Sequence, residues 1–401
     1  MDHRSEITKL FSFIFVWLIT CSSLLSQDNY GKYTFTPAPD VWYNSVDGVR
    51  LGIRVLGEHE GSFKDGPHRL DAGLWLGTNF PDNPISYYLS FTEPVKSISD
   101  FGEEGSVQAV SSIRTGFSSH SLSLNKRWQD GFNELRYKEV SASFSQQKMY
   151  DVAYRPYPIQ WSSGWKSLAG IEFMLHNESD EKTFELNLDF QQNLNPESPS
   201  FSVLNAEIWN VMSLNEHFGL ALRAFGGFTS ENTAPEFLYK ASYAQPINWL
   251  GNGISRAKGT LPTSWLDNGL AQISGGGNLR GYTDTQYSDL SVAGFNSIVA
   301  LNTEFEFPNP INSSLKNGMI GEFVFLKSYV FADAGTVFED NPVLLDAGVG
   351  LQFSINIPDF LGKPRGFALR YEIPFWISEP DAGKSNLEFR NLIGFGAVIS
   401  L

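Results

Sequence analysis

A glycine-rich segment around residue 280 carries the side chains best suited to a defined chemical role. Residues 275–282 read Gly-Gly-Gly-Asn-Leu-Arg-Gly-Tyr. Glycine tolerates positive φ angles and close backbone approach, so this segment can turn sharply and present one arginine and one tyrosine. A guanidinium held away from water needs a carboxylate partner, because an uncompensated buried charge is costly. The candidate residues of the segment are Gly275, Gly276, Gly277, Arg280, Gly281 and Tyr282.

Carboxylates that could serve as this partner follow on two expected strands. Within residues 297–307, alternation places Glu304 and Glu306 on one strand face, opposite two phenylalanines. The next expected strand, residues 331–337, carries an aspartate between two small residues. The candidates on it are Phe331, Asp333 and Gly335. One interpretation is an arginine–carboxylate contact between the segment and these strands, and the other is an exposed arginine in a glycine-rich loop.

Other site chemistries find little support in the sequence. Residues 275–282 match neither a dinucleotide-binding fingerprint nor a phosphate loop with its lysine. The six histidines form no pair at metal-ligand spacing, and His59, which lies between two glutamates, lacks a second histidine. The sequence contains no Gly-x-Ser-x-Gly motif. We therefore predict that the protein is not an enzyme and uses no metal and no cofactor.

Composition narrows the class of protein. The 401 residues include 29 lysines and arginines against 44 aspartates and glutamates, a formal net charge of −15. This acidic balance argues against nucleic-acid binding, which requires a basic surface to meet phosphates. The hydrophobic content of 42% is too ordinary for a helical membrane protein, whereas 14% aromatic residues and abundant glycine and proline favour an all-β protein.

The start of the chain is typical of an export signal. Two basic residues precede an apolar run over residues 10–19, and a serine-rich stretch then ends at Ser26. We predict a signal peptide at residues 1–26, a short segment at residues 27–40 and a barrel domain at residues 41–401.

The single cysteine, Cys21, lies within this signal. The residues before it weakly resemble a lipoprotein cleavage box, which leaves lipid attachment as an alternative to cleavage after Ser26. Cleavage after Ser26 would leave a mature chain with no cysteine and therefore no disulfide framework.

Segments of about ten residues alternate between apolar and polar side chains, the pattern of a strand with two unlike faces. The clearest cover residues 184–191, 346–356 and 367–373. The pattern fits a soluble sandwich with its apolar face buried, or a transmembrane barrel with that face in lipid. Strand length near that of a bilayer crossing, aromatic strand ends and the export signal favour the barrel. We predict an all-β fold, a transmembrane antiparallel β-barrel of about 16 strands, with the glycine-rich loop folded inward.

The ordered motifs resemble one family. Residues 277–282 are similar to the Arg-Gly-Phe/Tyr motif in the sixth extracellular loop of the outer-membrane assembly-factor superfamily, which includes BamA-type insertases and two-partner-secretion transporters. Residues 304–310 and 331–337 resemble the two strands that follow in that family, and residues 42–52 resemble its first strand. The resemblance extends from about residue 41 to the C-terminus.

The resemblance implies that the loop folds into the barrel and that Arg280 contacts Glu304 and Asp333 there, forming a loop lock. Residues that would support this lock are Gly275, Gly276, Gly277, Glu306, Phe331 and Gly335. The family usually carries periplasmic POTRA domains before the barrel, whereas only residues 27–40 precede the first expected strand. We therefore expect a barrel without POTRA domains.

A further expectation concerns the two ends of the barrel. In a closed barrel the first strand pairs with the last, and glycines weaken side-chain packing along that seam. The candidates are Gly48 and Gly52 in the first expected strand, with Gly394 and Gly396 in the last. The resemblance implies a seam that opens laterally, whereas strand curvature and twist offer a second explanation for the glycines.

These features predict a bacterial outer-membrane barrel that assists the assembly or translocation of outer-membrane or surface proteins as part of a complex. Its expected partners are outer-membrane lipid and a protein of that complex, with no nucleic acid. One alternative is a passive porin. Another is a membrane anchor for a separately encoded surface protein, because the chain from residue 370 onward resembles barrels fused to surface peptidases in Bacteroidota-type bacteria. A secreted β-sandwich is the third alternative.

Overall fold

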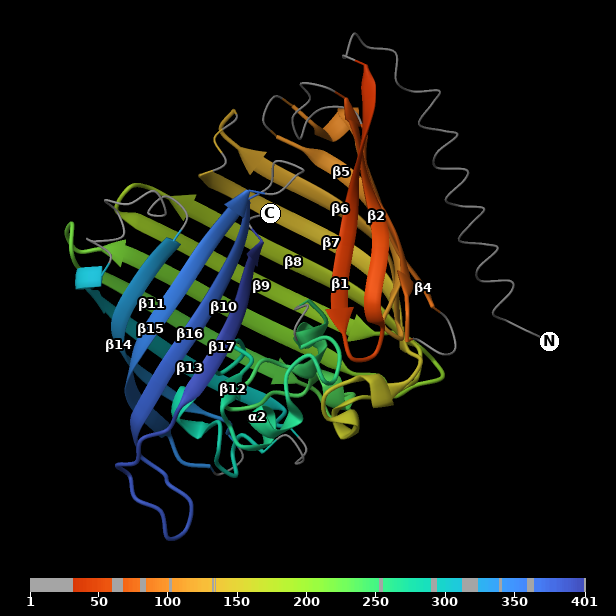
Figure 1. Ribbon diagram of the computed structural model, residues 1–401. Coiled ribbons are helices and arrows are strands. Elements are labelled where there is room, and N and C mark those ends of the chain that lie inside the picture. The colour runs from red at the N-terminus through yellow and green to blue at the C-terminus, as the bar shows by residue number, and fades with distance from the viewer. Residues whose placement is uncertain are drawn as a thin grey trace.

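The described part of the chain forms one curved, all-β sheet with a few short helices (Figure 1). The predicted signal peptide, Cys21 and residues 27–31 lie outside that part. The computed structural model describes residues 32–59, 68–79, 84–100, 103–131, 133, 135–251, 255–289, 294–311, 324–338, 341–358 and 364–399.

Sixteen of the seventeen strands in this sheet are long, and they pair antiparallel in chain order. The seventeenth is β12, which has two residues and pairs in parallel with β17. The strands are β1 (Tyr33–Asn44), β2 (Gly48–His59), β3 (Arg69–Gly77), β4 (Ile85–Pro94), β5 (Gly105–Arg114), β6 (Phe117–Gln129), β7 (Arg136–Met149), β8 (Lys166–Glu178), β9 (Lys182–Asn193), β10 (Ser202–Ser213), β11 (Gly219–Thr229), β12 (Ala271–Gln272), β13 (Ser297–Phe307), β14 (Val324–Thr336), β15 (Leu344–Pro358), β16 (Pro364–Ile377) and β17 (Leu392–Ile399).

The helices are short and lie in the connections between strands. In the described ranges, no helix is both long and apolar enough to cross a membrane. They are α2 (Thr263–Asp267) and the 3₁₀ turns η1 (Lys96–Ile98), η2 (Val152–Tyr154), η3 (Pro158–Gln160), η4 (Pro235–Phe237), η5 (Pro246–Gly251) and η6 (Arg280–Tyr282).

Each long strand has one apolar face and one polar face, and the apolar face is the exposed one. On β2, Leu51 and Ile53 are about half exposed, whereas Arg50, which precedes Leu51, is buried. On β13, Leu301 is 48% exposed while the neighbouring Asn302 is buried. All described strands belong to one sheet, so the sandwich alternative, which needs a second sheet over the apolar face, is wrong. We infer that the apolar face contacts lipid, since soluble proteins rarely expose so much apolar surface.

The first two strands correct the expectation of one strand over residues 42–52. Asn44 ends β1, and its side-chain oxygen accepts backbone N–H groups two and three residues later, at 3.0 and 2.8 Å. Gly48 then has a φ of 68°, which glycine adopts without strain. This side-chain-capped turn starts a hairpin, so Gly48 and Gly52 lie in β2 and not in the edge strand. The barrel segment also begins before residue 41, because β1 starts at Tyr33.

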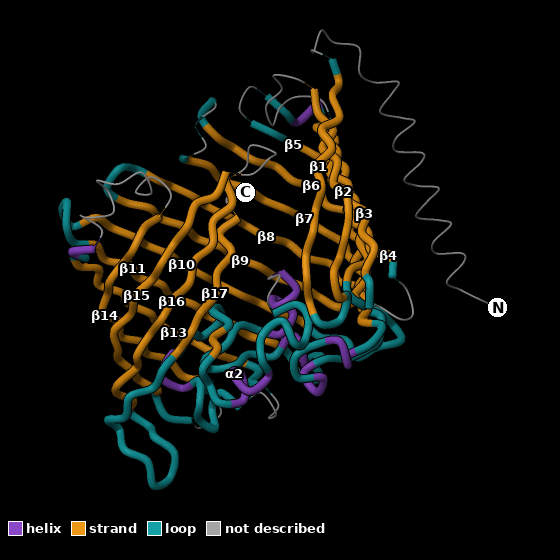
Figure 2. The backbone as a smooth tube through the Cα atoms, viewed as in Figure 1, coloured by secondary structure: helices purple, strands orange, loops and turns teal. Residues whose placement is uncertain are grey.

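The seam expected in a closed barrel is absent from the described residues. β1 pairs only with β2, and β17 pairs with β16 and β12, so β1 and β17 remain the separate ends of an open sheet (Figure 2). Gly394 and Gly396 lie in β17, at this open end. The seam prediction is wrong for Gly48 and Gly52. A Cβ atom on Gly52 would lie 2.1 Å from a ring atom of Trp75, so this glycine makes room for an indole ring.

Lipid contact of the exposed face can be tested at Ile171 on β8, which is 58% exposed. Ile171→Lys would place an ammonium group in the hydrocarbon and cost about 2–4 kcal/mol near the bilayer midplane. We expect less heat-modifiable, folded protein in outer membranes. The matched control is Glu172→Lys, on the opposite face of the same strand. Equal loss from both variants would contradict lipid contact of the apolar face.

Candidate functional site

The described residues of the connection between β11 and β13, 230–251, 255–289 and 294–296, pack against the sheet as a folded unit. Its side chains Tyr239, Leu279 and Tyr282 are fully buried in a cluster with Ile298 of β13 and other strand residues. The backbone N–H of Leu279 donates to the carbonyl oxygen of residue 241 at 3.0 Å, which closes the connection on itself. In Figure 2 the connection appears as teal loops with short purple helices, gathered at one end of the sheet.

Glycines in residues 275–282 fit places where a side chain would not. Gly275 and Gly276 have positive φ angles of 132° and 59°. A Cβ on Gly277 would lie 2.4 Å from Ile298. A Cβ on Gly281 would lie 2.6 Å from the Cβ of Asp346. The segment can therefore approach β13 and β15 closely only because these positions are glycine.

Arg280 lies at the centre of a buried charge cluster and has no solvent exposure. Its Nε and Nη2 donate to the two carboxylate oxygens of Asp333, each at 2.8 Å. Its Nη1 donates to Glu304 at 2.7 Å and to Glu372 at 2.8 Å. The guanidinium carbon also lies 3.8 Å from the ring centre of Phe331. The structure thus brings Arg280 together with both predicted carboxylates and with a third that the sequence reasoning missed.

Two further strand residues complete this group. Arg370 of β16 donates to Glu372 at 2.7 Å and also contacts Glu304. The Tyr329 hydroxyl donates to Glu372 at 2.7 Å and accepts from Arg370 at 3.0 Å. We call the group the Arg280 cluster, and its members are Arg280, Glu304, Tyr329, Asp333, Arg370 and Glu372.

The sequence held a usable signal for Arg370 and Glu372. They are two positions apart in a segment with clear alternation, residues 367–373, so they share one face of a strand. The alternation does not predict their contact with Arg280, because it does not reveal which distant loop reaches the same face of the sheet.

The charge balance of the cluster favours the ionised arginine. Burial acts to lower the pKa of Arg280, but the negative charges of Asp333, Glu372 and Glu304 outweigh burial and raise this pKa well above its usual value. A bidentate arginine–carboxylate pair supported by further hydrogen bonds is the arrangement in which a buried ion pair is best compensated. These contacts join residues 275–282 to β13, β14 and β16, which is the arrangement that a loop lock requires.

Of the remaining predicted residues, Tyr282 and Gly335 contact neighbouring strands, whereas Glu306 does not join the cluster. The Tyr282 hydroxyl bonds the carbonyl of residue 345 at 3.2 Å and Ser378 at 3.1 Å, which ties η6 to β15 and to the end of β16. At Gly335 a Cβ would lie 2.8 Å from a β13 carbonyl, so this glycine permits close approach. Glu306 lies outside the cluster and pairs with Lys327 at 3.4 Å.

A second anchor fixes the glycines themselves. Arg223 of β11 donates to the carbonyl of Gly276 at 2.7 Å and to the side chain of Asn302 at 2.8 Å. The amide of Asn302 in turn donates to the carbonyl of Asn278 at 3.1 Å and to Asp333 at 3.0 Å. Sequence reasoning missed Arg223, which lies some fifty residues before the loop.

The connection also reaches the open end of the sheet. Residues Ala271 and Gln272 of β12 pair in parallel with Ile393 and Gly394 of β17. The backbone N–H of Ile393 donates to the carbonyl of residue 270 at 2.6 Å. The start of the last strand is therefore covered by the same connection that carries Arg280.

The acids of the Arg280 cluster pair with guanidinium groups, although the Oε2 atom of Glu372 is buried without a hydrogen-bond partner. Over the described ranges, no three or more His, Cys, Asp or Glu side chains gather in a way that could hold a metal ion.

Comparison with known proteins gives weak likenesses only. No protein-family model matches the sequence, and no curated protein matches it. The structure is similar to BamA from Haemophilus ducreyi lacking POTRA domains 1–3, at 15% identity and a TM-score of 0.48, over 91% of this chain and 71% of that one. BamA-type barrels are also the class that residues 277–282 resemble.

Two other solved structures are similar to this chain at still lower sequence identity. CdiB from Escherichia coli has 10% identity and a TM-score of 0.45, with 91% of this chain covering 62% of that one. OccK11 (OpdR) from Pseudomonas aeruginosa has 9% identity and a TM-score of 0.29, over 90% of this chain and 91% of that one. This chain thus spans less than two thirds of CdiB, and no function follows from likenesses at this level.

Removing the central cation tests the lock. Arg280→Gln leaves Asp333 and Glu372 buried without it, so we expect a loss of about 3–5 kcal/mol in stability. The measurement is the temperature at which the heat-modifiable band of the folded protein disappears.

The matched control for this variant is Arg127→Gln. Arg127 contacts Glu139 at 2.6 Å, but both side chains are partly exposed, so its loss should cost only about 0–1 kcal/mol. A similar fall in stability for the two variants would show that Arg280 has no special structural role.

Proposed function

We propose that the protein is a bacterial outer-membrane barrel of the assembly-factor superfamily that assists the assembly or translocation of outer-membrane or surface proteins. We also propose that it works without catalytic chemistry of its own, in contact with outer-membrane lipid and with a protein partner. The observation that carries the proposal is the unpaired junction between β1 and β17.

Strand edges have a strong tendency to recruit further strands. Each edge presents a row of backbone N–H and C=O groups, and hydrocarbon offers these groups no water as an alternative partner. A strand of a client protein could satisfy them by β-augmentation. The short β12 covers only Ile393 and Gly394, so most of the β17 edge is left for such a strand.

The position of the long connection supports assembly over conduction. Its residues are fixed to the polar face of the sheet by Arg280 and by the Arg223–Asn302 anchor. A passive porin needs an open aqueous channel, whereas a locked loop of this size occupies the interior. The lock also keeps the connection next to the open edge without letting it detach.

Site-specific photo-cross-linking tests strand recruitment. A photoreactive residue at Val41 on β1, which is 63% exposed, should form adducts with newly made outer-membrane or surface proteins in cells. The matched position is Ile171 on β8, which is 58% exposed but lies in a strand paired on both sides. Adducts of equal yield at both positions, or none at Val41, would contradict recruitment at the edge.

Conductance in planar bilayers separates assembly from solute transport. Because the connection occupies the interior, we expect small and irregular currents from the purified protein. The control is a variant lacking most of residues 230–296, which should conduct more if it folds. Large, steady currents from the unaltered protein would favour the porin alternative.

A second candidate function is an anchor for a separately encoded surface protein. The connection between β16 and β17 exposes two large apolar side chains, Leu387 at 68% and Phe389 at 80%. Such side chains in a loop favour contact with a protein partner. Co-purification of a single surface protein, lost when both residues are replaced by serine, would favour the anchor over an assembly role.

A further inference from the structure

A second group of buried charges lies apart from the Arg280 cluster, around the β1–β2 and β5–β6 turns. We call it the Arg50 cluster. Its members come from four parts of the chain: Arg50 of β2, Arg114 at the end of β5, Arg155 after η2, and Arg256 in the long connection.

Hydrogen bonds draw these four parts together. The side chain of Thr115, beside Arg114, donates to Asp47 of the β1–β2 turn at 2.9 Å. Arg155 donates to the carbonyl oxygens of Thr115 and Arg256. The positive charges of Arg114, Arg155 and Arg50 act together with burial to lower the pKa of Arg256. Repulsion therefore acts on Arg256 from the other three arginines and on Arg114 from Arg50.

Carboxylates do not balance this charge. Among the described residues, the two acids that act on the cluster are Asp40 and Asp47, which leaves an excess of two positive charges there. Asp40 already accepts the indole N–H of Trp75 at 2.6 Å. Asp47 accepts from Asn44 at 2.7 Å and from Thr115. The other arginine on the same face of β2, Arg54, has its own partner in Asp71 at 3.6 Å.

Two of the guanidinium groups keep unused donors. The Nε atoms of Arg50 and Arg114 are buried and have no hydrogen-bond partner among the described residues. Arg50 is only 8% exposed and lies over the ring of Trp75 at 5.0 Å. Arg114 lies over the ring of Tyr88 at 5.5 Å. A buried donor without a partner is costly, and the Arg280 cluster shows how fully this chain satisfies a guanidinium elsewhere.

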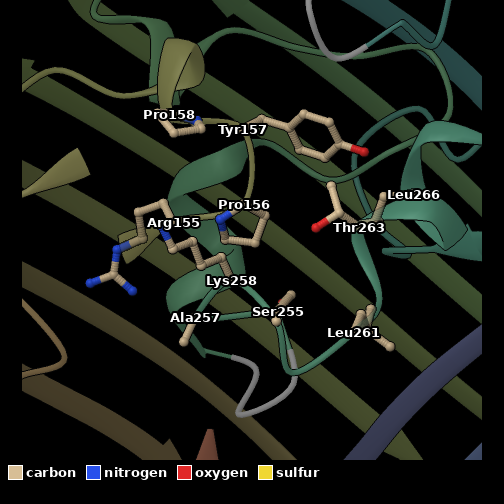
Figure 3. Close-up of a pocket in the computed structure, with 11 residues that line it drawn as sticks. Arg155, Pro156, Tyr157, Pro158, Ser255, Ala257, Lys258, Leu261, Thr263 and Leu266 are labelled. Atoms are coloured by element: carbon tan, nitrogen blue, oxygen red, sulfur yellow. The ribbon is translucent and has the colours of Figure 1, made fainter. Parts of the chain in front are cut away.

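A cavity of about 230 Å³ lies beside Arg155, but the guanidinium group of Arg155 does not point into it (Figure 3). Figure 3 shows the cavity between Tyr157, Lys258 and Leu266, and the guanidinium of Arg155 points away from it. The Arg155 side chain instead reaches toward Thr115 and the turns that hold the other arginines.

We propose that the Arg50 cluster binds a phosphate-type oxyanion through the free donors of Arg50 and Arg114. A guanidinium presents its donors as a planar fork that matches phosphate oxygens. A phosphate group carries about two negative charges, which equals the excess charge of the cluster. The group could belong to a free ion or to the phosphorylated headgroup of an outer-membrane lipid.

Thermal unfolding in detergent tests this binding. Replacing chloride by inorganic phosphate at equal ionic strength should raise the Tm of the full protein by about 2–4 °C, because the ligand binds the folded state. Arg50→Gln and Arg114→Gln should lose this shift. The control Arg127→Gln, which removes a guanidinium paired with Glu139 on other strands, should keep it.

A conservative variant and a comparison of lipids complete the test. If Arg114→Gln does not fold, Arg114→Lys keeps the charge without the fork and should show a smaller shift than the unaltered protein. Micelles with phosphorylated or dephosphorylated lipid A, without free phosphate, identify the source: a shift with the phosphorylated lipid only would assign the site to lipid phosphate. No shift from either source, or an undiminished shift in Arg50→Gln and Arg114→Gln, would overturn the proposal.

Discussion

The compensation of one buried positive charge is the constraint on which the rest of this structure depends. Arg280 has no contact with solvent, so its ionised form is stable only beside the carboxylates of Asp333, Glu304 and Glu372. These carboxylates come from β14, β13 and β16. The requirement works in both directions, because Asp333 and Glu372 are themselves fully buried and need the cation. One side chain therefore joins the long connection to three strands.

The two charge clusters differ in how their buried positive charge is compensated. In the Arg280 cluster the guanidinium of Arg280 pairs with three carboxylates of the chain, and these contacts join the connection to β13, β14 and β16. The Arg50 cluster keeps an excess of positive charge and unused donors at the other end of the strand order. Between these clusters lies the open junction of β1 and β17, so the unpaired edges of β1 and β17 are flanked by buried charges on both sides of the strand order.

Much of the architecture could be predicted from the sequence, and the failures have physical causes. Alternation sufficed for the strands, because side chains on a sheet repeat every two residues. The contacts of Arg280 with Glu304 and Asp333, which the family resemblance implied, are present in the structure. Alternation did not reveal the partners Glu372 and Arg223, which depend on contacts between segments far apart in the chain. The turn at Asn44 was missed, although the dipeptide Asp47-Gly48 is a turn signal in the sequence.

The most direct test of the central claim is a double-mutant cycle between Arg280 and Asp333. The free energy of unfolding would be measured for the unaltered protein, Arg280→Gln, Asp333→Asn and the double variant in one detergent. A buried, bidentate pair predicts that the double variant is more stable than the sum of the single losses implies, with a coupling energy of at least about 2 kcal/mol. A coupling energy near zero, with independent and small losses, would contradict the lock on which the whole account depends.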